Sequence, residues 1–483
     1  MKYASFFFAF CLFIFSFFGC VGPNDRQDEK TTKNEQQQIN QPESQKPAGQ
    51  EAAGIPENAQ TPQTNAGGLE IPTKKSIAVY LPKNAKKDDP VPVIFIFDPG
   101  ADGEFPVEKY KALAEKLGYA LVGSNVSKNG QELSQSLSIF KQMKNEFQTM
   151  QAINGKRIYT MGFSGGARVA TSLAMGGNNI SGVIGCGAGF PGGEDKSDLA
   201  FDYFALAGYR DFNMTELIRL DRNLEKTGFN SELYIFDGKH TWPAEDQMKE
   251  AFLWLEINAM KKQLTPKNEK IISETAGYFN ALISDYETDN RIFDASEAAG
   301  RAVHFLTGLT NTTDFENRFK TLSADSRYKT QFENKVKIMQ EEMGEQNKLL
   351  SSFTTMDAAW WNETVKELNK QLPNLERQNM NQRLIAWLGL VAYLSSNNAL
   401  RTGQTDVAGQ FLGIYATLEP YNPEHAYLGA VLQMQLKKPD FAIEYLKQAM
   451  ILGFRDLPRM IQDTAFVPLH NRNDFKNLVQ GAI

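Results

Sequence analysis

The chain has 483 residues, which is too long for one ordinary domain, so two or three domains are expected. Its apolar content of 42% and charged content of 22% are those of a soluble globular protein with ample core. The net charge of −6, without a basic stripe, excludes nucleic acid as an expected partner. Of the three cysteines, only Cys186 lies outside the N-terminal apolar segment, so no internal disulfide framework is expected.

Residues 1–19 are predicted to be an export signal. The stretch MKYASFFFAFCLFIFSFFGC has one lysine, then a Phe-rich apolar run, then a small residue before Cys20. This order is typical of secretory signals, and the apolar run is too short to span a bilayer comfortably. The ending SFFGC resembles the lipobox of bacterial lipoproteins, which implies that Cys20 becomes the lipidated first residue. An ordinary signal peptide with a chance cysteine is the alternative.

Residues 20–68 are predicted to be a disordered tether. They contain almost no large apolar residues and are rich in Gln, Asn, Glu and Pro, so they cannot bury enough surface to fold. As a flexible coil of about 48 residues, the segment spans on the order of 40 Å. We therefore expect the protein in the cell envelope, anchored to a membrane or cell surface by its lipid after export.

Residues 69–262 are predicted to form an α/β domain. Strand-like segments, short, apolar and bounded by turn residues, are PVPVIFIFDPG, YALVGSN, KRIYTMGF, ISGVIGCGAG, DYFALAG and SELYIFDG. Helical segments with apolar residues three and four apart alternate with them, as in PVEKYKALAEKLG, QELSQSLSIFKQMKNEFQTMQ and GGARVATSLAM. This alternation predicts a mostly parallel sheet with helices on both faces.

The pentapeptide GFSGG, residues 162–166, lies where one predicted strand gives way to a helix. A serine on such a turn needs small residues two positions before and after it, because strand and helix approach closely there. Gly162 and Gly166 meet this requirement. The helix N-terminus offers unpaired N–H groups where an oxyanion would form. We therefore predict that Ser164 is a nucleophile.

A serine hydroxyl needs a base, and of the four histidines only His240 lies in the α/β region, directly after its last strand. The acid is expected between nucleophile and histidine in chain order. Asp211 follows the penultimate strand and is favoured over Asp202, which is inside that strand, and over Asp237, which is almost beside His240. Cys186 is expected to be a buried packing residue, since no histidine is near it in the sequence.

The segments GFSGG, GYRDFN and GKHTWP resemble those of the α/β-hydrolase superfamily, in particular small secreted esterases related to polyhydroxybutyrate depolymerases, feruloyl esterases and dienelactone hydrolases. The resemblance implies acyl transfer to water by Ser164, His240 and Asp211. It also implies an oxyanion hole made by the N–H of Gly165 with that of Gly100 or Ala101, although FDPGADG departs from the usual His-Gly.

Two residues beside the predicted site have open roles. Trp242, next to the base, is expected either to line the substrate cleft or to pack in the core. Asp102 is expected to be a turn residue in preference to a substrate contact, because Asp is common in turns.

The second half is predicted to be all-α: a motif-free helical region at 270–380, then tetratricopeptide-like helix pairs at 381–483. Near the end, HAYLGAVLQMQLKKPDFAIEYLKQAMILG resembles a tetratricopeptide unit with small residues at Ala442 and Ala449, and Ala408 precedes Ala442 by 34 residues. These helices are expected to bind a protein partner. The tryptophans of DAAWWNETVKEL are expected in the core.

The expected function is therefore that of a membrane-anchored serine esterase with a helical accessory domain and an ester or acyl substrate. A serine peptidase of the same fold is the alternative within the enzymes, since the triad is common to both. A non-catalytic lipoprotein scaffold that binds a protein through its helical repeats is the other alternative. No cofactor or metal is expected, because no His/Cys/Asp cluster has ligand spacing.

Overall fold

The computed structural model describes residues 63–64, 70–71, 75–191 and 199–480. The predicted signal peptide, Cys20 and all of the predicted tether except residues 63–64 lie outside these ranges. Two short strands, β1 (Gln63–Thr64) and β2 (Glu70–Ile71), pair antiparallel with one another.

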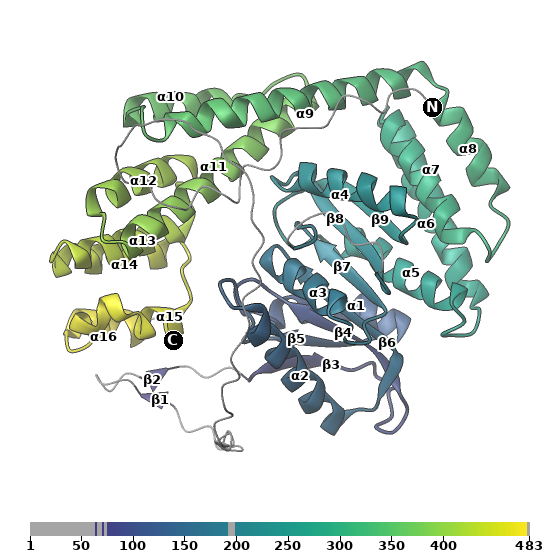
Figure 1. Ribbon diagram of the computed structural model, residues 1–483, viewed down its shortest axis with the longest axis horizontal. Coiled ribbons are helices and arrows are strands. Elements are labelled where there is room, and N and C mark those ends of the chain that lie inside the picture. Colours follow the sequence, from purple (N-terminus) through teal and green to yellow (C-terminus); the bar gives the residue numbers. More distant parts are fainter. Residues whose placement is uncertain (1–62, 65–69, 72–74, 192–198, 481–483) are drawn as a thin grey trace, which may run out of the picture. The chain divides into compact units, whose positions relative to one another are not determined.

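A seven-stranded sheet forms the centre of the first half (Figure 1). Its spatial order is β3-β5-β4-β6-β7-β8-β9. The strands are β3 (Ile77–Tyr80), β4 (Val91–Phe97), β5 (Ala120–Ser124), β6 (Ile153–Phe163), β7 (Gly182–Cys186), β8 (Asp202–Arg210) and β9 (Ser231–Lys239). Every neighbouring pair is parallel except β3 with β5, so the predicted mostly parallel α/β fold class is confirmed. The antiparallel edge strand β3 was not specified by the sequence pattern.

Helices cover both faces of the sheet, as the alternation of side chains along each strand requires. Along β4, Ile94 and Ile96 pack with α1 (Glu104–Leu117) and α5 (Glu245–Lys261) on one face. Phe95 and Phe97 face the other way, toward the remaining helices. These are α2 (Leu133–Met150), α3 (Gly165–Met175) and α4 (Met214–Thr227).

The strand order reverses at β4, because the chain adds β5 on one side of it and then β6 on the other. At such a switch point the connections after the two strands run in opposite directions and leave a crevice beyond their carboxyl ends. Ser164 follows β6 at this edge, and the loop that begins at Asp98 follows β4. The topology therefore places Ser164 and the loop after β4 at the switch point, the edge at which open parallel sheets commonly bind their ligands.

The second half is entirely helical in the described residues (Figure 1). Three helices share the apolar core beneath α5: α6 (Glu269–Thr288), α7 (Ile292–Leu306) and α8 (Thr313–Ser323). A separate core, from Ile338 to Val479, unites the remaining helices. These are α9 (Ser326–Ser352), α10 (Ala358–Leu368), α11 (Leu375–Arg401), α12 (Thr405–Leu418), α13 (Pro423–Gln435), α14 (Pro439–Ile451), α15 (Leu457–Gln462), a 3-10 turn (Thr464–Leu469) and α16 (Asn473–Gln480).

The small residues used to predict helix pairs are buried in this second core. Ala408, Ala442 and Ala449 are fully buried, and α11 packs on α12 as α13 packs on α14. Trp361 is also fully buried, which confirms its expected core position. The assignment of these pairs to the tetratricopeptide type stays a prediction.

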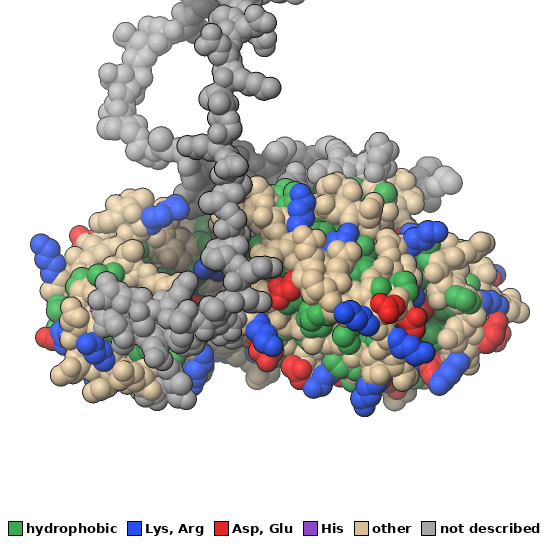
Figure 2. Space-filling model, turned by 90° about the horizontal axis from the view of Figure 1, so that it is seen from below, with side chains coloured by type: hydrophobic (Ala, Val, Ile, Leu, Met, Phe, Trp, Pro, Cys, Tyr) green, Lys and Arg blue, Asp and Glu red, His purple; other side chains and the backbone are tan. Residues whose placement is uncertain are grey.

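Two surface properties complete the description. None of the helices in the described ranges has both the length and the apolar character that a membrane span needs. On the face shown in Figure 2, Lys and Arg side chains lie among Asp, Glu and apolar ones over the described residues.

Candidate active site

Ser164 occupies a strained turn between β6 and α3. Its φ of 51° and ψ of −120° lie outside the conformations that a serine ordinarily adopts. The turn is held on both sides, because Ser164 N–H donates to the Cys186 carbonyl at 2.8 Å and its own carbonyl accepts from Ala167 N–H at 3.0 Å. Strain of this kind persists only where the surroundings enforce it, which is common at functional sites.

The two flanking glycines are required by close backbone contacts. A Cβ on Gly162 would lie 2.2 Å from the Gly166 carbonyl oxygen. A Cβ on Gly166 would lie 2.0 Å from the Phe97 carbonyl oxygen at the end of β4. Neither backbone oxygen can move aside as a flexible side chain could. The spacing of glycines around Ser164 thus follows from how tightly α3 packs against β4 and β6.

His240 joins the predicted nucleophile to the predicted acid. Its Nε2 lies 3.0 Å from Ser164 Oγ, and its Nδ1 lies 2.9 Å from Asp211 Oδ1. Ser164, Asp211 and His240 follow β6, β8 and β9, and the carboxyl ends of these parallel strands share one edge of the sheet. The Asp211 carboxylate is almost fully buried, whereas the His240 side chain is 17% exposed. The imidazole can therefore be reached from outside while the acid cannot.

The Asp211 carboxylate is oriented by the loop after β7. Asn213 N–H donates to Asp211 Oδ1 at 2.8 Å, and the Asn213 side-chain amide donates to the Gly187 carbonyl at 2.7 Å. Gly187 has a φ of 65°, and a Cβ there would lie 2.9 Å from Asp211 Oδ2. Cys186 is buried, as expected, and burial followed by the Asp211 charge raises the pKa of its thiol well above the ordinary value. It is a neutral packing residue.

The two other candidate acids lie elsewhere. Asp237 is 72% exposed in its side chain and pairs with Arg210 at 2.8 Å. Asp202 begins β8, at the opposite end of that strand from Asp211, and pairs with Lys262. Of the three aspartates weighed from the sequence, only Asp211 contacts His240.

Two aromatic rings that the sequence analysis did not single out pack against His240. The Phe163 and Phe212 rings lie 4.7 Å and 4.2 Å from the imidazole, centroid to centroid. Phe163 directly precedes Ser164 and Phe212 directly follows Asp211 in the chain. This adjacency was the signal in the sequence that could have identified them. The rings fix the plane of the imidazole, so that its two nitrogens face Ser164 and Asp211.

The predicted oxyanion donors differ in their availability. The Gly165 N–H, at the start of α3, has no acceptor among the described residues. The Gly100 N–H instead donates to Asp98 Oδ1 at 2.8 Å, and the Ala101 N–H makes a long 3.3 Å contact with the Asp98 carbonyl. Neither N–H is therefore free in this structure, because Asp98 accepts one through its side chain and contacts the other through its backbone carbonyl. The oxyanion role of Gly100 or Ala101 stays a prediction.

Trp242 explains how Asp98 is held in place. The indole Nε1–H donates to Asp98 Oδ2 at 2.8 Å, and the ring packs against Phe163 and Tyr110. Only 7% of Trp242 is exposed. The structure therefore favours the packing alternative for Trp242 over a role in lining a cleft.

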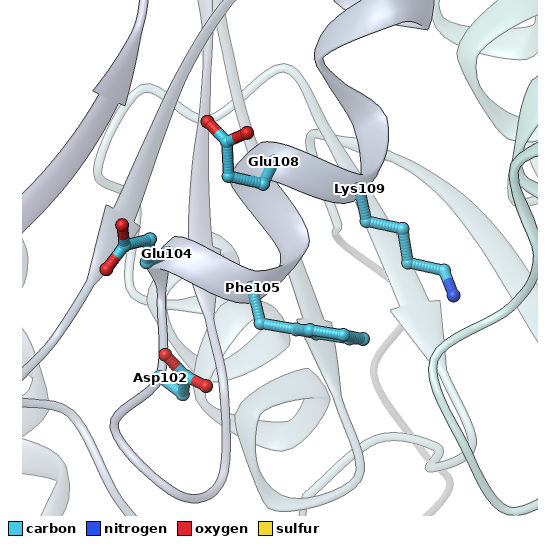
Figure 3. A pocket seen from close by; sticks show the side chains of 5 residues that line it. All are labelled: Asp102, Glu104, Phe105, Glu108 and Lys109. Carbon is cyan, nitrogen blue, oxygen red and sulfur yellow. The ribbon is translucent and has the colours of Figure 1, made fainter.

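An open hollow of about 610 Å³ lies on the first two turns of α1, directly after the Gly100–Ala101 loop (Figure 3). Asp102, Glu104, Glu108 and Lys109 line it together with Phe105, whose ring is half exposed. Lys109 Nζ lies 5.4 Å from the centroid of that ring. Asp102 belongs to the turn that leads into the helix. In the described part of the chain, no three His, Cys, Asp or Glu side chains are grouped so as to hold a metal ion.

No family model matches the sequence, and no curated protein matches it. Solved structures that resemble part of the chain include a carboxylesterase of Bacillus cereus, with 19% identity, a TM-score of 0.31, and coverage of 37% of this chain and 92% of that one. Another is the fluorophosphonate-binding serine hydrolase F of Staphylococcus aureus, with 11% identity, a TM-score of 0.30, and coverage of 37% of this chain and 91% of that one. A third is a putative dienelactone hydrolase of Klebsiella pneumoniae, with 13% identity, a TM-score of 0.29, and coverage of 38% of this chain and 99% of that one. The function proposed below rests on the geometry of the site.

Proposed function

We propose that this protein is a membrane-anchored serine hydrolase that cleaves carboxylic esters through Ser164, His240 and Asp211. The observation that carries the proposal is the continuous chain of contacts from Ser164 Oγ to His240 to Asp211, at 3.0 and 2.9 Å, on a strained strand-to-helix turn. These are the positions and distances that nucleophilic catalysis needs.

In the proposed reaction, Ser164 Oγ attacks the ester carbonyl while His240 Nε2 takes the hydroxyl proton. Asp211 accepts a hydrogen bond from the His240 Nδ1–H, which keeps Nε2 free as the base and stabilises the imidazolium that forms. His240 then returns the proton to the leaving alkoxide. Water activated by the same imidazole hydrolyses the acyl-enzyme and restores Ser164.

The oxyanion is proposed to bind the Gly165 N–H, which has no competing acceptor in the described residues. A second donor is needed for full stabilisation. The Gly100 N–H, in the loop after β4, is the second donor that we propose, and it must leave Asp98 Oδ1 to bind the oxyanion.

The test is covalent labelling of the full-length protein by a fluorophosphonate probe. We expect one labelled serine, Ser164, and no labelling of the Ser164→Ala variant, in which turnover should fall by about six orders of magnitude. Equal labelling of wild type and variant would contradict the proposed function. An inert but folded wild type would favour the scaffold alternative.

A panel of substrates separates esterase from peptidase. We expect turnover of p-nitrophenyl and feruloyl esters to exceed that of matched peptide p-nitroanilides. The reverse ranking would favour the serine peptidase, because the same triad serves both reactions.

The anchor is proposed from residues 1–68, whose composition combines an apolar segment ending at Cys20 with a polar tether. Cys20→Ser should transfer the protein from membrane to soluble fractions. Unchanged partitioning into detergent would place the anchor elsewhere.

A further inference from the structure

Tyr209 lies beside the predicted active site and is contacted by side chains of the helical half. It is the penultimate residue of β8 and precedes Asp211 by two positions. The register between β8 and β9 shifts between Gly208 and Arg210, so Tyr209 lies where the ladder of backbone hydrogen bonds is interrupted. Such irregularities are common beside active sites, and they leave backbone groups that need other partners.

The partner of the Tyr209 carbonyl is Arg383 on α11, 174 residues further along the chain. Arg383 Nη1 donates to this carbonyl at 2.5 Å. The other side of the guanidinium binds Glu342 on α9, with Nε 3.0 Å from each carboxylate oxygen and Nη2 2.6 Å from Oε2. Only about 1% of either residue is exposed.

The Tyr209 side chain is held by the same half of the molecule. Its hydroxyl donates to Asp294 on α7, and the cationic groups of Arg291 and Lys335 lie 5.5 and 4.4 Å from the centroid of its ring. Burial, followed by the Asp294 charge, raises the pKa of Tyr209 well above its ordinary value. Although burial opposes it, Lys335 and Arg291 hold the pKa of Asp294 below its usual value. A neutral phenol therefore donates to an ionised carboxylate.

Stability alone does not explain this cluster. A buried ion pair is weak evidence for stability, because well-packed apolar residues of similar volume often serve as well. The planar guanidinium, however, can bind a carboxylate along one edge and a carbonyl along another, which an apolar side chain cannot do. We name the set of Tyr209, Arg291, Asp294, Lys335, Glu342 and Arg383 the Tyr209 clamp.

We propose that the Tyr209 clamp positions the catalytic acid, and that Arg383 is its central positioning residue. The proposal rests on the proposed function, since it concerns the acid of the same triad. Between Tyr209 and Asp211 there is one residue, and Asp211 N–H closes a turn onto the Gly208 carbonyl at 3.0 Å. A displaced Tyr209 backbone therefore moves the Asp211 carboxylate away from His240 Nδ1. A misplacement of about 1 Å in such a site can cost about a hundredfold in rate.

The experiment measures the second-order rate of fluorophosphonate labelling against pH in the full-length protein. The test variant is Arg383→Met with Glu342→Met, which removes both buried charges together and so leaves neither unpaired. We expect labelling to slow by about ten- to a hundredfold per folded molecule. We also expect the acidic limb of the pH profile to shift to lower pH, because an imidazolium without its carboxylate loses its proton more easily.

The matched control is Arg157→Met with Glu256→Met. This pair is also buried, with both side chains 7% exposed, and Arg157 likewise shares its guanidinium with a second partner, the Tyr119 hydroxyl. Arg157 lies within β6, seven positions before Ser164 in the chain, and has no hydrogen bond to the triad residues among those of the described part of the chain. We expect the control to change thermal stability without changing the labelling rate per folded molecule or the pH profile.

The outcomes separate the two proposals. A wild type that is not labelled overturns the proposed function, and the clamp with it. A labelled wild type, together with a folded Arg383→Met/Glu342→Met variant of unchanged rate and pH profile, overturns the clamp alone. If the double variant does not fold, Arg383→Lys decides. Its ammonium keeps the charge beside Glu342 but lacks the planar fork of nitrogens by which Arg383 reaches Glu342 and the Tyr209 carbonyl together, so a smaller loss in the same direction is expected.

Discussion

Ser164 and Asp211, the predicted nucleophile and acid, both contact His240, but different parts of the chain hold them in place. Ser164 is fixed by its immediate surroundings, since the two glycines of its pentapeptide allow α3 to press against β4 and β6. Asp211 is held by Asn213 in its own loop, by the loop that contains Gly187 and, through Tyr209, by the clamp from the helical half. A short motif can therefore specify the nucleophile, whereas the position of the acid depends on the whole fold.

The largest expected effect tests which aspartate serves as the acid. Asp211→Asn should lower kcat by about four orders of magnitude with the fold intact, because an amide at this position favours the wrong tautomer of His240. Asp237→Asn is the matched control, and its exposed side chain predicts a loss of about tenfold or less. Steady-state ester hydrolysis with thermal melts of both variants measures this. If Asp237→Asn shows the large loss of kcat and Asp211→Asn the small one, Asp237 is the acid, and the contrast between Ser164 and Asp211 does not hold.

The next largest effect tests how tightly the chain packs around the Asp211 carboxylate. Gly187→Ala places a Cβ 2.9 Å from Asp211 Oδ2 and 3.1 Å from His240 Cε1, at a φ of 65°. We expect kcat to fall by about a hundredfold, since the carboxylate and the imidazole must separate.

Gly118→Ala is the control for backbone strain alone, because Gly118 has a φ of 76° with nothing within 4 Å of the added Cβ. It should lose about 1 kcal/mol of stability and keep its kcat. Equal kcat losses in the two variants would mean that strain, and not contact with the triad, is responsible.

The smallest expected effect is on stability and concerns a carboxyl group on α4 that takes no part in the proposed reaction. Burial, followed by the charges of Glu232, Glu225 and Glu297, raises the pKa of Asp221 on α4 to about 7. The folded state thus favours the protonated form, and the stability present at low pH is lost as the pH rises toward 7. Asp221→Asn should therefore stabilise the protein at pH 8, on the order of 1 kcal/mol after allowing for partial solvent screening, and little at pH 4.

Urea unfolding at the two pH values measures the effect of Asp221→Asn. A gain in stability of equal size at pH 8 and pH 4 would mean that the substitution acts through packing and not through the ionisation of Asp221. Labelling by the fluorophosphonate should be unaffected at either pH.

The sequence was sufficient to predict the alternation of strands and helices from β4 to β9, because buried parallel strands are apolar throughout and glycine-bounded. It also identified Ser164, Asp211 and His240, which the structure brings together. Asp98 was missed because a single aspartate in a turn has no pattern that shows which N–H group it will accept from. Arg383 was missed for a similar reason: on one helix it has the spacing of an ordinary surface residue, and its burial arises only when α9 and β8 pack against it.

The packing of the Phe163 and Phe212 rings against His240 has a spectroscopic consequence. Protons held above the face of an aromatic ring are shielded by its ring current, so the carbon-bound imidazole protons of His240 should resonate upfield of those of an exposed histidine. The chain has only four histidines, which makes this signal assignable by substitution. Its chemical shift would follow the ionisation of the base directly, without substrate or probe, and would report any rotation of the ring when the acid is displaced.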